Sequence, residues 1–313
     1  MGEVDREAFR AAMARAVDGC DPHAGLHGPT STSWRVSRES VLFLGGGCAA
    51  LLQLAHPYVA HAVAEHSRTQ ADPIGRFTRT FQHVYAMVFG TLGAASSSAR
   101  GVRRIHERVL GELDERVGAF PKGHRYAAND AGALLWVHAT LVHTAIRVYE
   151  LVVTPLSNLE KATYWLESKR FARMFGVPDA VLPPTWPAFL RYWERTLDSR
   201  TIAVGTHARA IGSFLMTPPN PPTTPFVLWY RRMTAGLLPP RLQVAFELPF
   251  SPRDQLLFRA SLATLRAVYP RLPRRLRDVP AYNEAMARLA GRERPDRVGR
   301  ALERMVLRTL TPA

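Results

Sequence analysis

The sequence predicts an all-α protein built as one large helical domain. Apolar residues recur at spacings of three and four in most long segments of the 313-residue chain, and no series of alternating strands is present. The absence of a repeat of fixed period excludes a solenoid. A chain of this length buries roughly three quarters of the surface that its unfolded state exposes, so its helices can enclose a sizeable core.

The N-terminal segments predict an amphipathic helix followed by a buried one. Residues 1–15 include several charged residues in an amphipathic pattern. They therefore lack the apolar core of a signal peptide. Residues 40–64 form the longest stretch without a formal charge. A glycine triplet, two histidines and a proline within it make a lipid-facing helix costly, so a buried and interrupted helix is predicted. We therefore expect no transmembrane helix and a cytoplasmic location, with peripheral contact to a membrane left open.

The later helices are predicted by their ends as well as by their periodicity. Asn129-Asp130 is typical of an N-cap, Ser251-Pro252 combines a cap with a proline in the first turn, and Gly176 stands where a C-cap glycine belongs. The periodic segments are Val102–Leu113, Ala131–Val152, Leu159–Phe175, Ala188–Leu197, Arg253–Tyr269 and Ala281–Leu289.

Residues 217–240 are rich in proline and predict a loop. Aromatic residues in this segment, such as Phe226 and Trp229, need cover from other side chains. This favours a loop packed on a single domain over a linker between two domains, which is the alternative.

The charge of the chain is unevenly distributed. The formal net charge is +15, and residues 208–313 contribute +11 of it, from 18 Arg and 7 acidic residues. No helix-turn-helix, finger or aromatic-basic platform accompanies these arginines, so nucleic-acid binding is not expected. An anionic membrane surface is one partner that would use them, and a solvated surface without a partner is the alternative.

Histidine must carry any metal site in this chain. Two cysteines, Cys20 and Cys48, cannot form a disulfide framework or a cysteine-rich zinc site. Ten of the 11 histidines lie between residues 23 and 143. Three of them recur every five residues, which turns 140° per step on a helix and does not gather them on one face: His56, His61 and His66.

Two further patterns are candidates for ligand binding. Arg76 and Thr80 lie one helical turn apart and would offer a cation and a hydroxyl to one ligand, although a capped helix with a solvated arginine has the same pattern. His106 shares a predicted helix face with Val102 and Val109, where either a haem ligand or a structural histidine would lie. The glycine triplet at residues 45–47 lacks the lysine of a phosphate loop, and close backbone packing explains it better.

Several stretches resemble, in the same order, the oxygenase family that includes latex-clearing rubber oxygenase and the fungal oxygenase MpaB of the mycophenolic acid pathway. The resemblance covers roughly residues 30–275. The stretches are Trp34–Glu39, Leu51–Pro57, Asp72–Thr80, Ile105–Val109, Tyr126–Asp130, Trp136–Thr140, Gly176–Pro178 and Leu182–Pro183.

The resemblance implies an all-α fold with one haem b, a histidine as proximal iron ligand, and attack by O2 on a hydrophobic, often polyisoprenoid, substrate. It implies His106 as the iron ligand, with His138 as the second candidate. The family's Arg-x-x-x-Thr pair is most similar to Arg76 and Thr80. The resemblance departs at one position: the rubber oxygenases have a lysine just before the threonine of this pair, and this chain has Arg79 there. The resemblance therefore leaves open how O2 is controlled on the distal side of the haem and whether the chain cleaves rubber.

The candidate site follows from these correspondences. The expected catalytic residues are Arg76, Arg79 and Thr80, and the expected metal ligand is His106. The expected cofactor-binding residues are Gly46, Gln53, His56, Arg76, Thr80 and His138.

The expected organisation is an N-terminal extension over 1–30, a catalytic domain over 31–280 and a basic helical tail over 281–313. The expected function is a haem b-dependent oxygenase that acts on a hydrophobic, isoprenoid or lipid-like substrate. Two alternatives are a non-enzymatic helical carrier of a hydrophobic ligand or haem, and a basic adaptor that binds nucleic acid or acidic surfaces.

Overall fold

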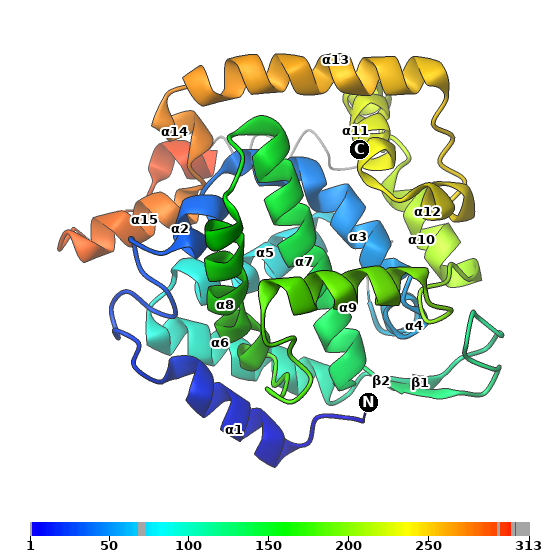
Figure 1. Ribbon diagram of the computed structural model, residues 1–313, viewed down its shortest axis with the longest axis horizontal. Helices are drawn as coiled ribbons and strands as arrows, with labels where there is room; N and C mark the ends of the chain where they lie inside the picture. The colour runs from blue at the N-terminus through cyan, green and yellow to red at the C-terminus, as the bar shows by residue number, and fades with distance from the viewer. Residues whose placement is uncertain (1, 68–72, 293–294, 302–303, 305–313) are drawn as a thin grey trace.

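The computed structural model describes residues 2–67, 73–292, 295–301 and 304. It confirms the all-α prediction, because helices form nearly all of the regular structure and a single short antiparallel hairpin is the exception among the described residues. Figure 1 shows the long helix α7 near the centre of the molecule, with the hairpin at its edge. Parts of the predicted basic tail lie outside the described residues.

The first half of the chain contains six α-helices, one 3₁₀ helix and both strands of the described part. These elements are α1 (Arg6–Val17), α2 (Thr32–Ser37), η1 (Ser40–Gly45), α3 (Gly46–Leu54), α4 (Pro57–His66), α5 (Pro73–Phe89), α6 (Leu92–His106), β1 (Leu110–Glu112) and β2 (Arg125–Ala127).

The second half begins with α7 and is helical in all its described elements. These are α7 (Ala131–Val152), α8 (Asn158–Met174), α9 (Trp186–Asp198), α10 (Thr206–Leu215), η2 (Pro221–Thr223), α11 (Thr224–Leu237), α12 (Pro240–Ala245), α13 (Pro252–Val268), η3 (Tyr269–Arg271), α14 (Arg274–Arg277) and α15 (Pro280–Leu289).

The ends of three helices confirm the caps that the sequence predicts. The Asp130 side chain accepts from the first amides of α7, and Ser251 and Asp254 form a reciprocal capping box at the start of α13. Gly176 follows α8 with a positive φ of 85°, a conformation that favours glycine. Side-chain and backbone preferences therefore set these boundaries locally.

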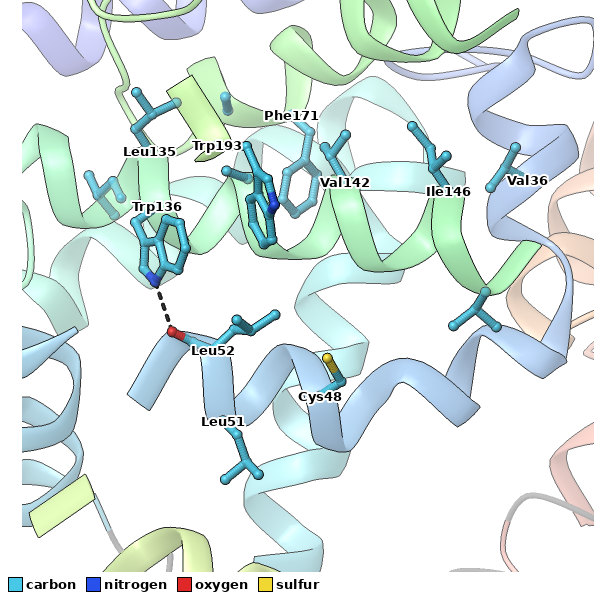
Figure 2. Packing of buried hydrophobic residues seen from close by; sticks show 14 of the residues in the cluster. Val36, Cys48, Leu51, Leu52, Leu135, Trp136, Val142, Ile146, Phe171 and Trp193 are labelled. Atoms are coloured by element: carbon cyan, nitrogen blue, oxygen red, sulfur yellow. Dashed lines mark hydrogen bonds between the residues drawn. The ribbon is translucent and has the colours of Figure 1, made fainter. Parts of the chain in front are cut away.

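The core lies between α7 and the helices that pack on it, which include α3, α8 and α13. Figure 2 shows Trp136 of α7 donating its indole N–H to the carbonyl of Leu52 in α3, at 2.8 Å. The buried indole of Trp34 donates in the same way to Val88 of α5, also at 2.8 Å. Each of these buried polar groups is thus satisfied while its ring adds apolar area to the core.

The uncharged segment 40–64 forms a buried, interrupted helix, as predicted. It consists of η1, α3 and α4, with a bend of 99° between the first two elements and α4. Pro57 occupies the first turn of α4 and His56 caps it. Since most residues of α3 are buried, its apolar composition reflects its place in the core.

The N-terminal helix α1 packs against α8. Its buried residues are Phe9, Ala12 and Ala16. The amide of Val4, just before this helix, donates to the carbonyl of Asn129 at 2.9 Å. The segment predicted as an extension therefore contributes to the same core as the rest of the described chain.

Two local expectations need correction. The helix predicted over Val102–Leu113 ends at His106, and residues 110–112 pair with β2 instead. The loop predicted over 217–240 is shorter in the structure, because α11 begins at Thr224. Pro225 lies in the first turn of that helix, where proline is compatible with helical backbone.

Among the described residues, α7 is long and apolar enough to span a membrane, and the bent pair of Ser40–Leu54 and Pro57–His66 passes the same criterion if counted as one span. Of the 18-residue apolar window within α7, 67% is buried inside the protein. Its position in the core accounts for this composition.

Candidate functional site

A cavity lies where α2, η1, α3, α5, α7 and α8 meet. It holds about 950 Å³ of space free of atoms, its open mouth included. Most of its lining side chains are apolar, and none of the described lining residues is a lysine or an arginine.

The wall contributed by α5 follows the helical repeat. Phe81, Val84, Tyr85 and Val88 line the cavity and stand at positions i, i+3, i+4 and i+7. The ring centroids of Phe81 and Tyr85 lie 4.9 and 6.4 Å from that of Phe43, which belongs to η1. These aromatic rings give the site a water-excluding surface suited to a flat or apolar ligand.

His138 is a polar group in this apolar wall. Its side chain comes from α7, is 4% exposed, and stacks against Phe171 at 6.0 Å between ring centroids. Burial lowers the pKa of His138 to about 3. The imidazole is therefore neutral at physiological pH, the form in which a ring nitrogen can bind a metal.

The hydrogen bonds of His138 indicate which nitrogen carries the proton. Ser168 Oγ donates to the carbonyl of Trp165 at 2.8 Å, so its lone pair accepts from His138 Nε2 at 3.3 Å. The Nδ1 atom of His138 is buried and has no hydrogen-bond partner in the structure. Since buried polar atoms are rarely left unpaired, this lone pair is free to accept a ligand.

A second histidine, His27, also lines the cavity. Burial and the nearby charge of Arg170 lower its pKa to about 4. His27 is not predicted from the sequence, because no helical periodicity or motif marks it. The stripe on α5, by contrast, could have been found from its spacing alone.

The glycine triplet allows close helix packing beside the cavity. A Cβ at Gly45 would lie 2.5 Å from Thr144 of α7, and one at Gly47 would lie 2.4 Å from Thr234 of α11. Both separations are too short for a side chain, which confirms the packing interpretation. Gly45 and Gly46 themselves line the cavity, so the predicted cofactor-binding Gly46 lies in its wall.

His106, the predicted metal ligand, is not among the residues that line this cavity. It is the last residue of α6, so Val109 lies beyond the end of the helix. The helix face that His106 was predicted to share with Val109 therefore does not form. Burial, followed by the charge of Arg103, lowers its pKa to about 4, while a hydrogen bond with Asn129 raises it. His106 thus contacts the segment that precedes α7.

Two other predicted cofactor-binding residues, Gln53 and His56, do not line the cavity and instead bond to neighbouring protein groups. Gln53 Nε2 donates to Thr140 Oγ1 at 3.1 Å, which joins α3 to α7. His56 Nδ1 accepts from the amide of Tyr58 at 3.3 Å, and its ring packs on Tyr58 and Phe120. Burial lowers the pKa of His56 to about 4, as it would for a neutral core histidine.

The three predicted catalytic residues belong to α5. The side chain of Arg76 lies outside the described residues. Arg79 and Thr80 are exposed, and neither belongs to the stripe of α5 that faces the cavity. The structure therefore brings together two of the predicted site residues, Gly46 and His138, in one cavity.

A second group of metal-ligand side chains lies apart from the cavity lining. It consists of His61, Asp114 and His207, whose ligand atoms all lie within 4.8 Å of one another. His61 is one of the three histidines that helical spacing alone did not gather. Asp114 comes from the hairpin loop and His207 comes from α10. Both are far from His61 in the sequence, so no local spacing predicts that the three side chains meet.

Comparisons with known proteins add a family match over most of the chain. Residues 34–267 match the family described as the catalytic domain of the ER-bound oxygenase mpaB/B′ and rubber oxygenase. Uncharacterized proteins of Mycobacterium bovis and Mycobacterium tuberculosis are each 28% identical over 233 residues, which cover 72% of this chain and 88% of theirs. No solved structure shows a significant match.

Proposed function

Because this chain belongs to the catalytic-domain family of the ER-bound oxygenase mpaB and rubber oxygenase, its general activity is that of an oxygenase, and we propose that it uses haem b to oxidise a hydrophobic substrate with O2. The observation that carries the proposal is His138, which lines an apolar cavity and whose buried Nδ1 atom has no hydrogen-bond partner. When bound, haem would supply the O2 chemistry that amino-acid side chains lack.

His138 and Ser168 are the residues of this cavity that would hold a haem. His138 would be the iron ligand through Nδ1, and Ser168 would hold the opposite nitrogen and so fix the orientation of the ring. Gly45 and Gly46 belong to the lining, where the missing side chain of Gly45 lets η1 pack closely on Thr144 of α7. We therefore propose His138 in place of His106 as the iron ligand.

The apolar lining also supports a hydrophobic substrate. Phe43, Phe81 and Tyr85 would exclude water and bind an alkene or lipid-like chain through contact area. Ionised groups are absent from the described lining, so a charged substrate would be desolvated without compensation. Substrates of this class are the candidates to assay.

The test begins with the absorption spectrum of the full-length protein, as purified and after titration with haemin. We expect a Soret band that saturates at one haem per chain. His138→Ala should abolish this band, whereas His106→Ala, the matched control on α6, should retain it. Circular dichroism and the thermal unfolding midpoint establish that both variants are folded.

Three results would contradict the proposal or part of it. A colourless protein that takes up no haemin excludes haem dependence. A band lost in His106→Ala and retained in His138→Ala reverses the ligand assignment. A haem-loaded protein that binds a long-chain alkene, with a reductant present, and consumes no O2 is a carrier of hydrophobic ligands.

A further inference from the structure

We propose that His61, Asp114 and His207 form a binding site for a divalent transition-metal ion of the Zn²⁺ class, separate from the haem cavity. None of the three residues lines that cavity. The proposal does not depend on the proposed haem chemistry, because it rests on the geometry of these three side chains alone.

The three ligands come from separate elements that the fold brings together. His61 lies on α4, Asp114 lies in the loop between β1 and β2, and His207 lies on α10. Asp114 Oδ1 is 2.9 Å from His61 Nε2, and Asp114 Oδ2 is 2.9 Å from His207 Nε2. A zinc ion binds imidazole nitrogens and a carboxylate oxygen at about 2.0–2.2 Å, so small side-chain rotations would place all three around one ion.

The hydrogen-bond geometry of His61 points to a cation. Its Nδ1 atom is 2.9 Å from the carbonyl of Pro57, which can only accept, so Nδ1 carries a hydrogen. With the hydrogen on Nδ1, the ring directs Nε2 at a carboxylate oxygen 2.9 Å away. Two acceptors at this distance repel unless a proton or a metal ion lies between them, and a backbone carbonyl on the opposite nitrogen is typical of metal-bound histidine.

The surroundings hold the ligands in place and leave the site open. The histidine ring of His61 is 1% exposed, whereas the side chains of Asp114 and His207 are 61% and 30% exposed. An ion can therefore enter from solvent and meet one rigid ligand. Glu115, next to Asp114, accepts from the Thr206 amide at 2.6 Å and from its hydroxyl at 2.9 Å, which fixes the hairpin loop against α10.

A close approach of the loop to α10 is required for this arrangement. A Cβ at Gly205, before α10, would lie 2.5 Å from Glu115 Oε1, so glycine permits the contact. Three protein ligands leave a fourth position for water or an added group, as in zinc sites that are not fully closed. The bound ion would join α4, the hairpin and α10.

The experiment titrates chelator-treated full-length protein with Zn²⁺ by isothermal titration calorimetry. We expect one site per chain, a rise in the thermal unfolding midpoint on addition of Zn²⁺, and visible absorption from Co²⁺ bound in its place. His207→Ala and Asp114→Asn should each weaken binding at least tenfold and abolish the rise. Both positions are partly exposed, so these variants should fold.

The matched control is His23→Ala, which removes an exposed histidine distant in sequence from the site. It should bind Zn²⁺ as the unaltered protein does. Absence of Zn²⁺ binding, or binding that His207→Ala and Asp114→Asn leave unchanged, would overturn the proposal. Asp114 would then be an ion-pair partner of two protonated histidines.

Discussion

Ser168 Oγ lies 3.3 Å from Nε2 of His138, while its own proton is directed to the Trp165 carbonyl at 2.8 Å. The hydroxyl thereby selects the tautomer of a buried imidazole whose other nitrogen has no partner. Two residues on α7 and α8 thus prepare a nitrogen lone pair on a side chain that lines an apolar cavity. The arrangement matches the way in which outer hydrogen bonds orient histidine ligands in metal sites.

The first prediction concerns Ser168 as a positioning residue. Ser168→Ala removes the acceptor for Nε2–H of His138, so the ring loses its fixed orientation. We expect haemin affinity to fall about 10- to 100-fold, the usual cost of losing such a partner, with an altered Soret band. Ser168→Thr keeps the hydroxyl and should restore both. A purely structural role would lower the unfolding midpoint in Ser168→Ala and leave the spectrum of the bound haem unchanged.

The second prediction concerns the buried ion pair between Glu39 and Arg277. Glu39 is 1% exposed, receives two hydrogen bonds from Arg277 at 2.8 and 3.1 Å, and accepts a third from Tyr269 at 3.0 Å. Arg277→Met leaves the carboxylate without its main partner and should lower the free energy of unfolding by about 3 kcal/mol or more. Denaturant unfolding measures this loss.

A double variant isolates the charge from the packing at this pair. Glu39→Gln removes the charge and keeps an acceptor for Tyr269, so Glu39→Gln/Arg277→Met should recover part of the loss. Arg15→Met is the control, because the Arg15–Asp179 pair is exposed and should contribute less than about 1 kcal/mol. Equal losses in Arg277→Met and the double variant would show that packing, not charge, is responsible.

The third prediction is a pH dependence of stability that arises from buried His56. Burial lowers its pKa from 6.5 to about 4, so the unfolded chain binds a proton more tightly than the folded one. The free energy of unfolding should therefore fall as the pH drops from about 6.5 to 4. From a shift of this size, His56 should contribute a loss of about 2 to 3 kcal/mol at pH 4.5.

His56→Asn removes this titration and keeps an N-cap acceptor for α4. Urea unfolding at pH 7 and pH 4.5 should show a smaller difference between the two pH values in this variant than in the unaltered protein. His23→Asn reports the effect of removing an exposed imidazole. An unchanged difference in His56→Asn would mean that His56 is not a buried neutral group.

Much of the helical fold could be predicted from local sequence. Asp130, Ser251 and Gly176 mark helix ends because each acts on backbone groups within a few residues. The segment 217–240 was harder, because Pro225 is compatible with both a loop and the first turn of a helix. The strand at residues 110–112 was missed because it is short and depends on its partner at 125–127.

The candidate site could be predicted in type but only partly in position. Histidine as the metal-binding residue followed from composition, and the order of motifs indicated the family that the comparison shows. His106 and His138 both lie in helices with apolar neighbours, so periodicity could not choose between them. Which of them lines a cavity depends on where α5, α7 and α8 lie around it.

The sequence by itself determined the all-α class, the boundaries of several helices and the oxygenase family, because these depend on periodicity, capping and the order of local motifs. Only the tertiary structure decided that His138 lines the cavity and that His61 meets Asp114 and His207. The physical reason is that a site forms from side chains on separate elements. Their meeting is fixed by long-range packing, which no local spacing encodes.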